Sequence, residues 1–309
     1  MGGSGGVFSH STPEDYQERI RREQERSVDE EFNGEVSTFI DVLLAQYNDR
    51  DKETIDVHLK GIVAALRDRI DGAIETLFGG SIDKHTYVDG LSDIDALVLL
   101  NDPEVSGDMP NAVLARLSKI LHERFPNTDI KIGTLAVTVF FSDKHEVQLL
   151  PAIRVQGGFK IPAAKGNKWA EVSPEKFVEK LTRVNDSCGG KVVPTIKLVK
   201  AINNGLPKAF QLTGYHMESL AIEAFESYSG RKNTKAMLGH FFSEAASRVL
   251  SPIQDKTGQS VHVDEYLGKA GGSKRIAVSR ELMRIARRIR NADAAQSLAQ
   301  WKALFGDLV

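Results

Sequence analysis

The sequence contains only one cysteine, Cys188, and no long hydrophobic run. A single thiol cannot form an intrachain disulfide, which favours a reducing compartment. The longest apolar runs, residues 96–100 and 135–141, are far shorter than the roughly 20 residues of a membrane-spanning helix. The chain also lacks the basic and apolar segments of a secretory signal. We therefore expect a soluble, cytoplasmic protein that does not associate with membranes.

An excess of charge of one sign is absent as well. The 309 residues include 40 lysines and arginines against 42 aspartates and glutamates, which gives a formal charge of −2. This balance excludes a surface built throughout for nucleic acid, although a local basic groove stays possible. Charged residues make up 27% and hydrophobic residues 41% of the chain, which excludes a wholly disordered protein and leaves enough apolar material for a sizeable core.

The predicted elements divide the chain into two lobes. Residues 1–12 are rich in Gly and Ser and cannot pack, so they are expected to be a disordered linker or the remnant of a tag. Helices and strands alternate over residues 13–165, whereas helical patterns alone fill residues 166–309. The predicted fold class is therefore α/β, of the α+β kind, with a mixed lobe followed by an all-helical lobe.

Hydrophobic periodicity sets the expected element boundaries. The second helix is expected to run as far as the Gly79-Gly80 pair, because helices tend to stop at such pairs. The predicted helices cover residues 13–47, 52–78, 112–125, 174–186, 192–204, 214–229, 233–250, 278–290 and 292–305. The predicted strands cover residues 93–100, 129–142 and 146–153. The first helix is expected to dock through Val36, Phe39, Ile40, Val42 and Leu43.

The most informative stretch is FGGSIDKHTYVDGLSDIDALVLLND, residues 78–102. Asp93 and Asp95 open an apolar strand, and residues two apart on a strand share a face, with Cα atoms about 6.6 Å apart. Two carboxylates at this spacing can hold two divalent ions about 3.5–4 Å apart. A bare Asp-x-Asp can also be a solvated turn, but the buried strand behind these acids and the Gly80-Ser81 element before them favour a metal site.

Gly80 and Ser81 complete the pattern on the N-terminal side of the two acids. Glycine lets the backbone approach phosphate oxygens closely, and the Ser81 hydroxyl adds a hydrogen-bond donor. The sequence has no GxxxxGK[ST] loop, so a Walker-type grip on phosphate is not expected.

The sequence GGS, a spacer and DGLSDIDALVLL resembles the signature of nucleotidyltransferases related to DNA polymerase β. It is most similar to the bacterial cyclic-oligonucleotide synthases, the CD-NTases of CBASS anti-phage operons, which are related to oligoadenylate synthetase and cyclic GMP-AMP synthase. The resemblance extends from residue 52 to at least residue 268. It implies a polymerase β-like palm with a mixed sheet, followed by a helical bundle lobe.

The same resemblance implies an activity, its cofactors and its partners. Nucleoside triphosphates would be joined and closed into a cyclic oligonucleotide that acts on a downstream effector in anti-phage defence, and pyrophosphate would be released. Asp93 and Asp95 would hold two Mg²⁺ ions, with Mn²⁺ as a possible substitute. Gly80 and Ser81 would hold the donor phosphates. A linear nucleotidyltransferase acting on tRNA or on a protein hydroxyl is the alternative activity.

One position departs from the family pattern. Family members carry a third acid three residues before a proline on a later strand, and the matching segment EVQLLPAI has Gln148 there. A neutral amide offers one carbonyl oxygen but not the negative charge that Mg²⁺ prefers. Glu146 lies on the same face about 6.6 Å away, so it could replace the acid only through a strand shift or a bridging water. Gln148 is therefore interpreted as an engineered inactivation, as a natural substitution or as the mark of a nucleotide-binding pseudoenzyme.

The resemblance also implies nucleotide contacts in the helical lobe. Lys197 and Lys200 lie three apart and so on one helix face, where family members direct lysines at the donor triphosphate. Tyr215, in LTGYHMESLAIEAF, matches an aromatic residue that stacks on the donor base. The alternatives are a solvated pair of lysines and a buried structural tyrosine. Glu218 belongs to the same pattern and receives no chemical role.

A local concentration of positive charge lies near the end of the chain. Residues 269–290 contain eight basic residues and one acid, Glu281, and the arginines at helical spacing are Arg280, Arg284, Arg287 and Arg288. This stretch could bind nucleic acid or an acidic partner, or it could form a solvated face, so nucleic-acid binding stays an open question. No histidine lies at metal-ligand spacing from Cys188 or from another histidine, so no zinc site is expected.

Overall fold

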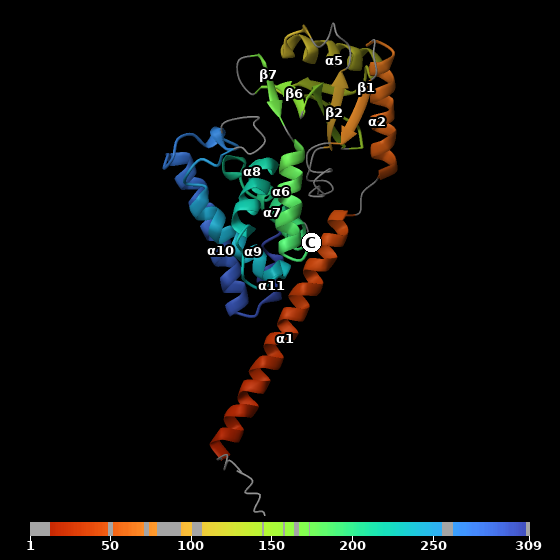
Figure 1. Cartoon of the computed structure of the whole chain (residues 1–309). Helices are drawn as coiled ribbons and strands as arrows, with labels where there is room; N and C mark the ends of the chain where they lie inside the picture. Colours follow the sequence, from red (N-terminus) through yellow and green to blue (C-terminus); the bar gives the residue numbers. More distant parts are fainter. Residues whose placement is uncertain are drawn as a thin grey trace, which may run out of the picture.

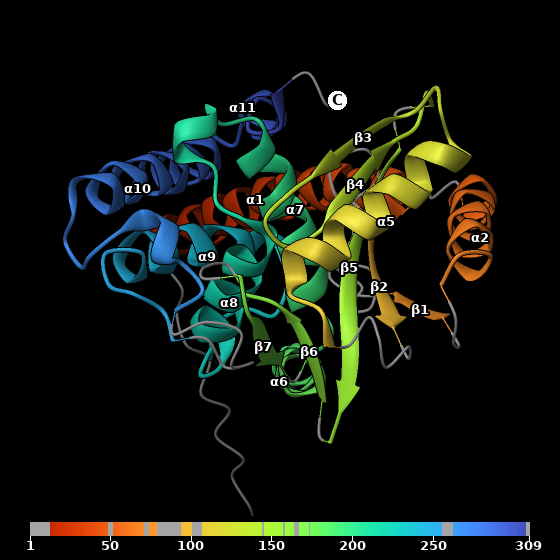
Figure 2. The ribbon, with the colours of Figure 1, turned by 90° about the horizontal axis from the view of Figure 1, so that it is seen from above.

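Seven strands form one mixed sheet in the part of the chain that the computed structural model describes (Figures 1 and 2). The described residues are 13–48, 52–70, 74–78, 94–100, 107–143, 145–156, 158–163, 167–172, 174–254 and 262–306. The strands are β1 (Ile74–Phe78), β2 (Ile94–Leu100), β3 (Asp129–Ile132), β4 (Val137–Phe140), β5 (Glu146–Val155), β6 (Gly158–Pro162) and β7 (Trp169–Val172). Their order is β1-β2-β5-β4-β3, with β6 paired to β5 and β7 paired to β6. Only β2 and β5 run parallel among these pairs.

Two helices, α2 (Lys52–Arg67) and α5 (Pro110–Arg124), cover one face of this sheet (Figure 2). Their apolar side chains share a core with alternate strand residues, among them Val98 of β2 and Leu149 of β5, both fully buried. Because side chains alternate along a strand, the intervening residues face the other side of the sheet. Leu99 and Ala152 lie there and pack in a small cluster with residues of β6 and β7.

The second lobe is helical and follows the sheet in the sequence (Figure 1). Its elements are α6 (Pro174–Ser187), α7 (Val192–Asn204), η1 (Lys208–Phe210), α8 (Gly214–Phe225), α9 (Thr234–Arg248), η2 (Glu265–Leu267), α10 (Ser273–Ala294) and α11 (Leu298–Lys302). They enclose one large core that includes Trp301, Phe225 and Phe241, all fully buried. The α+β fold class predicted from the sequence is confirmed. No helix among the described residues is long and apolar enough to cross a membrane.

The first helix, α1 (Pro13–Asn48), packs on the helical lobe rather than on the sheet. Val36, Phe39, Ile40 and Leu43 are buried in the core of that lobe, as the sequence predicted, but Val42 is 53% exposed and its predicted burial is wrong. Leu43 belongs to the buried stripe, and Val42, one residue earlier, lies about 100° away from it around the helix and therefore off that stripe. Figure 1 shows the first half of α1 extending beyond the lobe.

The predicted helix over residues 52–78 is wrong in its last part. Helix α2 ends at Arg67, and residues 74–78 form strand β1, which pairs antiparallel with β2 from Ile74 opposite Leu100 to Phe78 opposite Ala96. The apolar positions 70, 74 and 77 fit helical spacing, but a short apolar segment is ambiguous between helix and strand. Residues 74–78 form a strand because they pair with the buried strand β2. The spacing of apolar residues within the segment contains no information about that partner.

The predicted strand over residues 129–142 is two strands, β3 and β4, that form a hairpin. The amide of Gly133 donates to the carbonyl of Ala136 at 2.8 Å and closes the turn. A Cβ at position 133 would lie only 3.2 Å from that carbonyl oxygen, so the turn requires close approach of a glycine. Strands β6 and β7 were not predicted, because segments this short carry little periodicity.

Candidate active site

Strands β2 and β5 place two of the predicted site positions side by side. The parallel register pairs Asp95 with Gln148, and β4 on the other side pairs Thr138 with Gln148. Neighbouring strands lie about 4.8 Å apart, so the backbones at positions 95 and 148 are direct neighbours. Val147 and Leu149 are fully buried under the covering helices. Gln148, which is half-buried, therefore belongs to the opposite face of the sheet.

The other predicted palm residues are described only in part or not at all. Gly80, Ser81 and Asp93 lie outside the described residues, and Asp95 is described as a backbone position only. Glu146 is exposed, lies two residues before Gln148 on β5 and pairs with Phe140. Gln148 is thus the β5 residue next to Asp95, whereas Glu146 lies two residues away from that position along the strand.

The donor set at this edge fits a hard divalent cation in its chemistry. The Asp95 carboxylate is an oxygen donor of the kind that Mg²⁺ prefers, and the register places Gln148, whose side chain carries an amide oxygen, opposite it on the neighbouring strand. A neutral amide in that position supplies a ligand atom but no charge. These residues can therefore bind a divalent ion, but with an amide at position 148 they do not fully neutralise its charge.

In the helical lobe, Lys197 and Lys200 are both buried on α7. The alternative of two lysines on a solvated surface is therefore wrong. The ammonium of Lys200 donates to Oε1 of Glu218 at 3.0 Å, and the two side chains are only 7% and 1% exposed. A buried charge requires such a partner, because leaving it unpaired is strongly destabilising. Glu218, to which the sequence assigned no role, is thus the partner of a predicted site residue.

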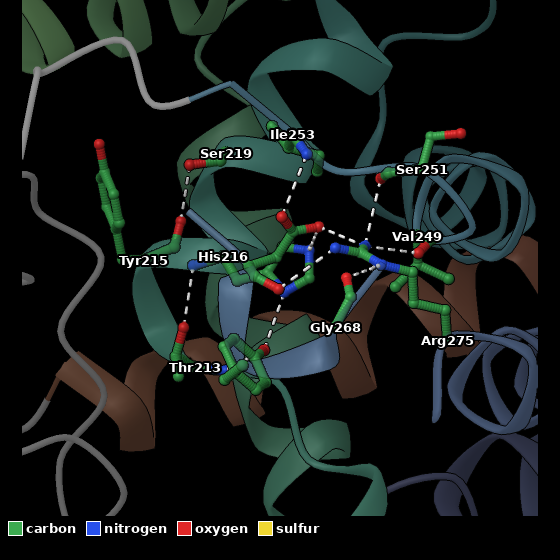
Figure 3. Close-up of polar contacts among 11 residues, drawn as sticks. Thr213, Tyr215, His216, Ser219, Val249, Ser251, Ile253, Gly268 and Arg275 are labelled. Carbon is green, nitrogen blue, oxygen red and sulfur yellow. Dashed lines mark hydrogen bonds and ion pairs between the residues drawn. The ribbon is translucent and has the colours of Figure 1, made fainter. Parts of the chain in front are cut away.

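Tyr215 lies in the first turn of α8, where the chain fixes the helix start. The Thr213 hydroxyl caps the helix by accepting from the amide of His216 at 3.3 Å. The Tyr215 ring is partly buried against Phe177, with ring centroids 4.9 Å apart and planes at 47°. Figure 3 shows this ring directed away from the buried polar cluster around His216. The Tyr215 ring thus packs on Phe177 on one side and is only partly buried.

The polar cluster beside Tyr215 was not found by sequence reasoning (Figure 3). Asp264 and Arg275 form a fully buried ion pair at 2.6 Å. Arg275 also donates to the carbonyls of Val249, Ser251 and Gly268, and the amide of Ile253 donates to Asp264. These hydrogen bonds join residues 249–268, between α9 and α10, to one another and to α10. Arg275, counted in the basic stretch of residues 269–290, is fully buried and not available to a partner.

His216 connects that ion pair to the start of α8. Its Nδ1 lies 2.8 Å from the hydroxyl of Tyr266, which also accepts from the amide of Thr213 at 3.2 Å. Burial is the main cause that lowers the pKa of His216 to about 4; the Asp264 carboxylate opposes this shift, and the Arg275 guanidinium adds to it. Loss of solvent around its hydroxyl likewise raises the pKa of Tyr266 to about 12, although the residue as a whole is 38% exposed. His216 is therefore neutral at physiological pH, and the cluster positions the helix turn that carries Tyr215.

The basic face of α10 is exposed to solvent. Arg280, Arg284, Arg287 and Arg288 all have exposed side chains. Arg284 pairs with Glu281 at 2.5 Å, and Arg288 donates to the carbonyl of Ala303 at 2.6 Å. Two of the four arginines thus have partners within the chain.

A family model matches the part of the chain that contains all strands of the sheet. A family model described as the Second Messenger Oligonucleotide or Dinucleotide Synthetase domain, SMODS, matches residues 31–185. Among curated protein sequences, none matches the chain significantly.

Solved structures resemble the chain over most of its length at low identity. CdnC of Escherichia coli MS115-1, solved with ATP, has a TM-score of 0.65 and 17% identity, with 87% of this chain and 93% of that chain covered. CdnG of Bradyrhizobium diazoefficiens, a CD-NTase solved with GTP, has a TM-score of 0.64 and 15% identity, with 82% and 88% covered. DncV of Vibrio cholerae, a cyclic AMP-GMP synthase, has a TM-score of 0.61 and 12% identity, with 97% and 92% covered.

The solved structures show that the fold is shared, and the family model covers the segment that contains β2, β5 and the Asp-x-Asp motif. Similarity in both sequence pattern and fold therefore supports the resemblance drawn from the motif. The chain belongs to the SMODS family of nucleotidyltransferases, and it shares its fold with CdnC, CdnG and DncV.

Proposed function

We propose that this nucleotidyltransferase joins nucleoside triphosphates into a cyclic oligonucleotide and releases pyrophosphate. The observation that carries the proposal is the register of Asp95 with Gln148 on the parallel strands β2 and β5, inside the segment that matches the family. Solved structures of similar fold contain ATP or GTP, and one is a cyclic AMP-GMP synthase. These neighbours favour triphosphates as substrates and a cyclic product.

The proposed roles of the palm residues follow from their chemistry. Asp93 and Asp95 hold two Mg²⁺ ions, which Mn²⁺ can replace, and Gly80 with Ser81 holds the donor phosphates. Bound ions of this kind activate the attacking hydroxyl and stabilise the leaving pyrophosphate. The chain itself contributes mainly position and charge, because phosphoryl-type transfer needs little covalent assistance from the protein.

In the helical lobe we propose that Tyr215 stacks on the donor base, since its ring is only partly buried and lies in a firmly capped first turn. Lys197 and Lys200 are proposed to contact the donor phosphates. Lys200 approaches them as a member of an ion pair with Glu218, so its charge is already partly compensated before the nucleotide binds.

We further propose that Gln148 lowers turnover more than it lowers nucleotide binding. Glutamine and glutamate have nearly the same volume, so the strand register and the substrate site should be retained. What is lost is one negative charge beside two dications. The product is proposed to act on a downstream effector in anti-phage defence in the cytoplasm.

A nucleotide-binding pseudoenzyme is the second candidate, and the amide at position 148 is the observation that favours it. The two are separated by incubating the full chain and its Gln148→Glu variant with labelled triphosphates and Mg²⁺ or Mn²⁺. A phosphatase-resistant product identified by mass spectrometry supports the cyclic synthase. A linear product, or labelled tRNA or protein, supports a linear transferase. No product from either form, with retained triphosphate binding, supports the pseudoenzyme.

A further inference from the structure

Three potential metal ligands lie together at the edge of the palm. His58 belongs to α2, and Asp143 and His145 belong to the turn between β4 and β5. Nε2 of His58 lies 2.6 Å from Oδ2 of Asp143, and Nδ1 of His145 lies 3.1 Å from Oδ1 of the same carboxylate. One ligand atom from each residue lies within 4.8 Å of the other two. Two elements 85 residues apart in the sequence thus present two imidazoles around one carboxylate.

The surrounding chain fixes the orientation of these groups. The His58 ring is stacked on Phe141, with centroids 3.6 Å apart and planes at 14°. The amide of Phe141 donates to the carbonyl of His145 at 2.9 Å and closes the turn. The backbone amide of His145 donates to Oδ1 of Asp143 at 3.1 Å. Fixed rings and a fixed carboxylate reduce the cost of ordering ligands around an ion.

Burial leaves the cluster shielded but accessible. The side chains of His58, Asp143 and His145 are 17%, 37% and 19% exposed, respectively. Nδ1 of His145 is buried and lies 3.1 Å from Oδ1 of Asp143. This nitrogen and the carboxylate already face each other at a distance from which both could bind one ion.

We propose that His58, Asp143 and His145 bind a Zn²⁺ ion that fastens α2 to the turn between β4 and β5. Two imidazoles and one carboxylate are a set that Zn²⁺ accepts, with water in the fourth position. A tetrahedral ion bonded at about 2.0 Å separates its ligand atoms by about 3.3 Å. The two short contacts, at 2.6 and 3.1 Å, therefore need to open by less than 1 Å.

This site is distinct from the catalytic one in position and in chemistry. His58 lies on the helix that covers Val147 and Leu149, whereas Gln148 belongs to the other face of the sheet. Imidazole nitrogens favour Zn²⁺, while the oxygen donors proposed for catalysis favour Mg²⁺. The bound ion would fix the turn from which β5 begins, three residues before position 148. Its expected effect is therefore on the stability and register of the palm rather than on the reacting atoms.

The test is a Zn²⁺ titration of the full chain in excess Mg²⁺, in competition with a chromophoric chelator. We expect one tightly bound Zn²⁺ and a rise in melting temperature, because an ion that binds only the folded state stabilises it. His58→Ala, Asp143→Asn and His145→Ala should each weaken the affinity by at least about 100-fold, since even partners of metal ligands are worth about 10–100-fold. His122→Ala removes an exposed histidine of α5 and is the matched control, expected to leave the affinity unchanged.

Two more measurements distinguish Zn²⁺ binding here from Zn²⁺ binding at the catalytic acids and from misfolding of the variants. The Asp93→Asn/Asp95→Asn variant should bind Zn²⁺ as the unmodified chain does, because it removes only the catalytic acids. Co²⁺ added to the unmodified chain should give the visible absorption of a tetrahedral nitrogen-oxygen site, a readout that does not depend on any variant folding. Absence of Zn²⁺ binding at micromolar concentration, or equal weakening by His122→Ala, would overturn the proposal and leave a metal-free hydrogen-bonded cluster.

Discussion

The two lobes of this nucleotidyltransferase place their polar groups by different means. In the palm, the backbone pairing of β2 with β5 is enough to place position 148 beside Asp95. In the helical lobe, buried ion pairs such as Lys200–Glu218 and Asp264–Arg275 fix the polar groups through the side chains themselves. A substitution at position 148 should therefore change chemistry with little cost in folding, whereas one in the buried ion pairs of the helical lobe should cost folding first.

The largest effect on folding is expected for Arg275→Met. This change leaves Asp264 charged, fully buried and without its main partner, and breaking one side of a buried pair costs about 3–5 kcal/mol. The free energy of unfolding from chemical denaturation measures the loss. Arg280→Met, on the exposed face of the same helix, should change it by no more than about 0.5 kcal/mol. Equal losses in the two variants would contradict the contrast between the lobes.

Lys200→Met should lower the free energy of unfolding by about 3 kcal/mol, because the buried Glu218 carboxylate then loses the ammonium that lies 3.0 Å away. The double variant Lys200→Met/Glu218→Met should recover most of that loss, since a buried pair can often be replaced by apolar groups. Triphosphate affinity separates the two roles of Lys200, which are the structural ion pair with Glu218 and the proposed contact with the donor phosphates. If it contacts phosphate, the double variant regains stability without regaining affinity.

Tyr215→Ala should weaken triphosphate binding by about 1–3 kcal/mol, the usual contribution of stacking on one base. Tyr215→Phe keeps the aromatic face and should retain most of the affinity. Binding is measured by calorimetry with ATP and GTP in the presence of Mg²⁺. Equal affinity of the alanine variant and the unmodified chain would show that the tyrosine only packs on Phe177.

The smallest effect concerns pH and His216, which is enclosed by Asp264, Arg275 and Tyr266. Its folded pKa of about 4 lies below the unfolded value of 6.5. Between these values the unfolded state binds more protons, so stability is fully present above pH 6.5 and falls as the pH drops toward 4.

By pH 5 the contribution of His216 to this loss should be on the order of 1–2 kcal/mol. Denaturation curves at pH 8, 6.5 and 5 measure it. The His216→Gln variant, which has no titrating ring, should lose less stability over that range than the unmodified chain. A variant with the same pH dependence would show that other groups carry the effect.

Local patterns predicted the helical lobe better than the palm. The starts of α7 and α8, at Val192 and Gly214, agree with the predicted helices over residues 192–204 and 214–229. The predicted helices over residues 278–290 and 292–305 have wrong bounds, because α10 runs from Ser273 to Ala294 and α11 covers only Leu298–Lys302. Strand β5 was also found, because its residues combine apolar alternation with a clear polar turn before it. Strand β1 was taken for helix, since its pairing with β2 is a tertiary contact that spacing within the segment cannot show.

The candidate active site also shows that sequence patterns do not reveal tertiary contacts. The sequence predicts Asp93 and Asp95 from one continuous motif, DGLSDIDALVLL. It predicts position 148 from another, EVQLLPAI. Partners brought together by the fold were missed: Glu218 lies 18 residues from Lys200, and His58 lies 85 residues from Asp143. Spacing along the chain did not indicate a zinc site, because spacing cannot show that the fold brings His58 to Asp143 and His145.

The most direct test of the central claim compares turnover by the unmodified chain and by Gln148→Glu. Both forms should bind ATP and GTP with Mg²⁺ to a similar extent, because the strand register does not change. Product formation should rise at least about 100-fold in the glutamate variant, since removal of even an indirect partner of a metal ligand costs about 10–100-fold. Equal turnover by the two forms would contradict the account and would assign the third metal ligand to Glu146 or to another group.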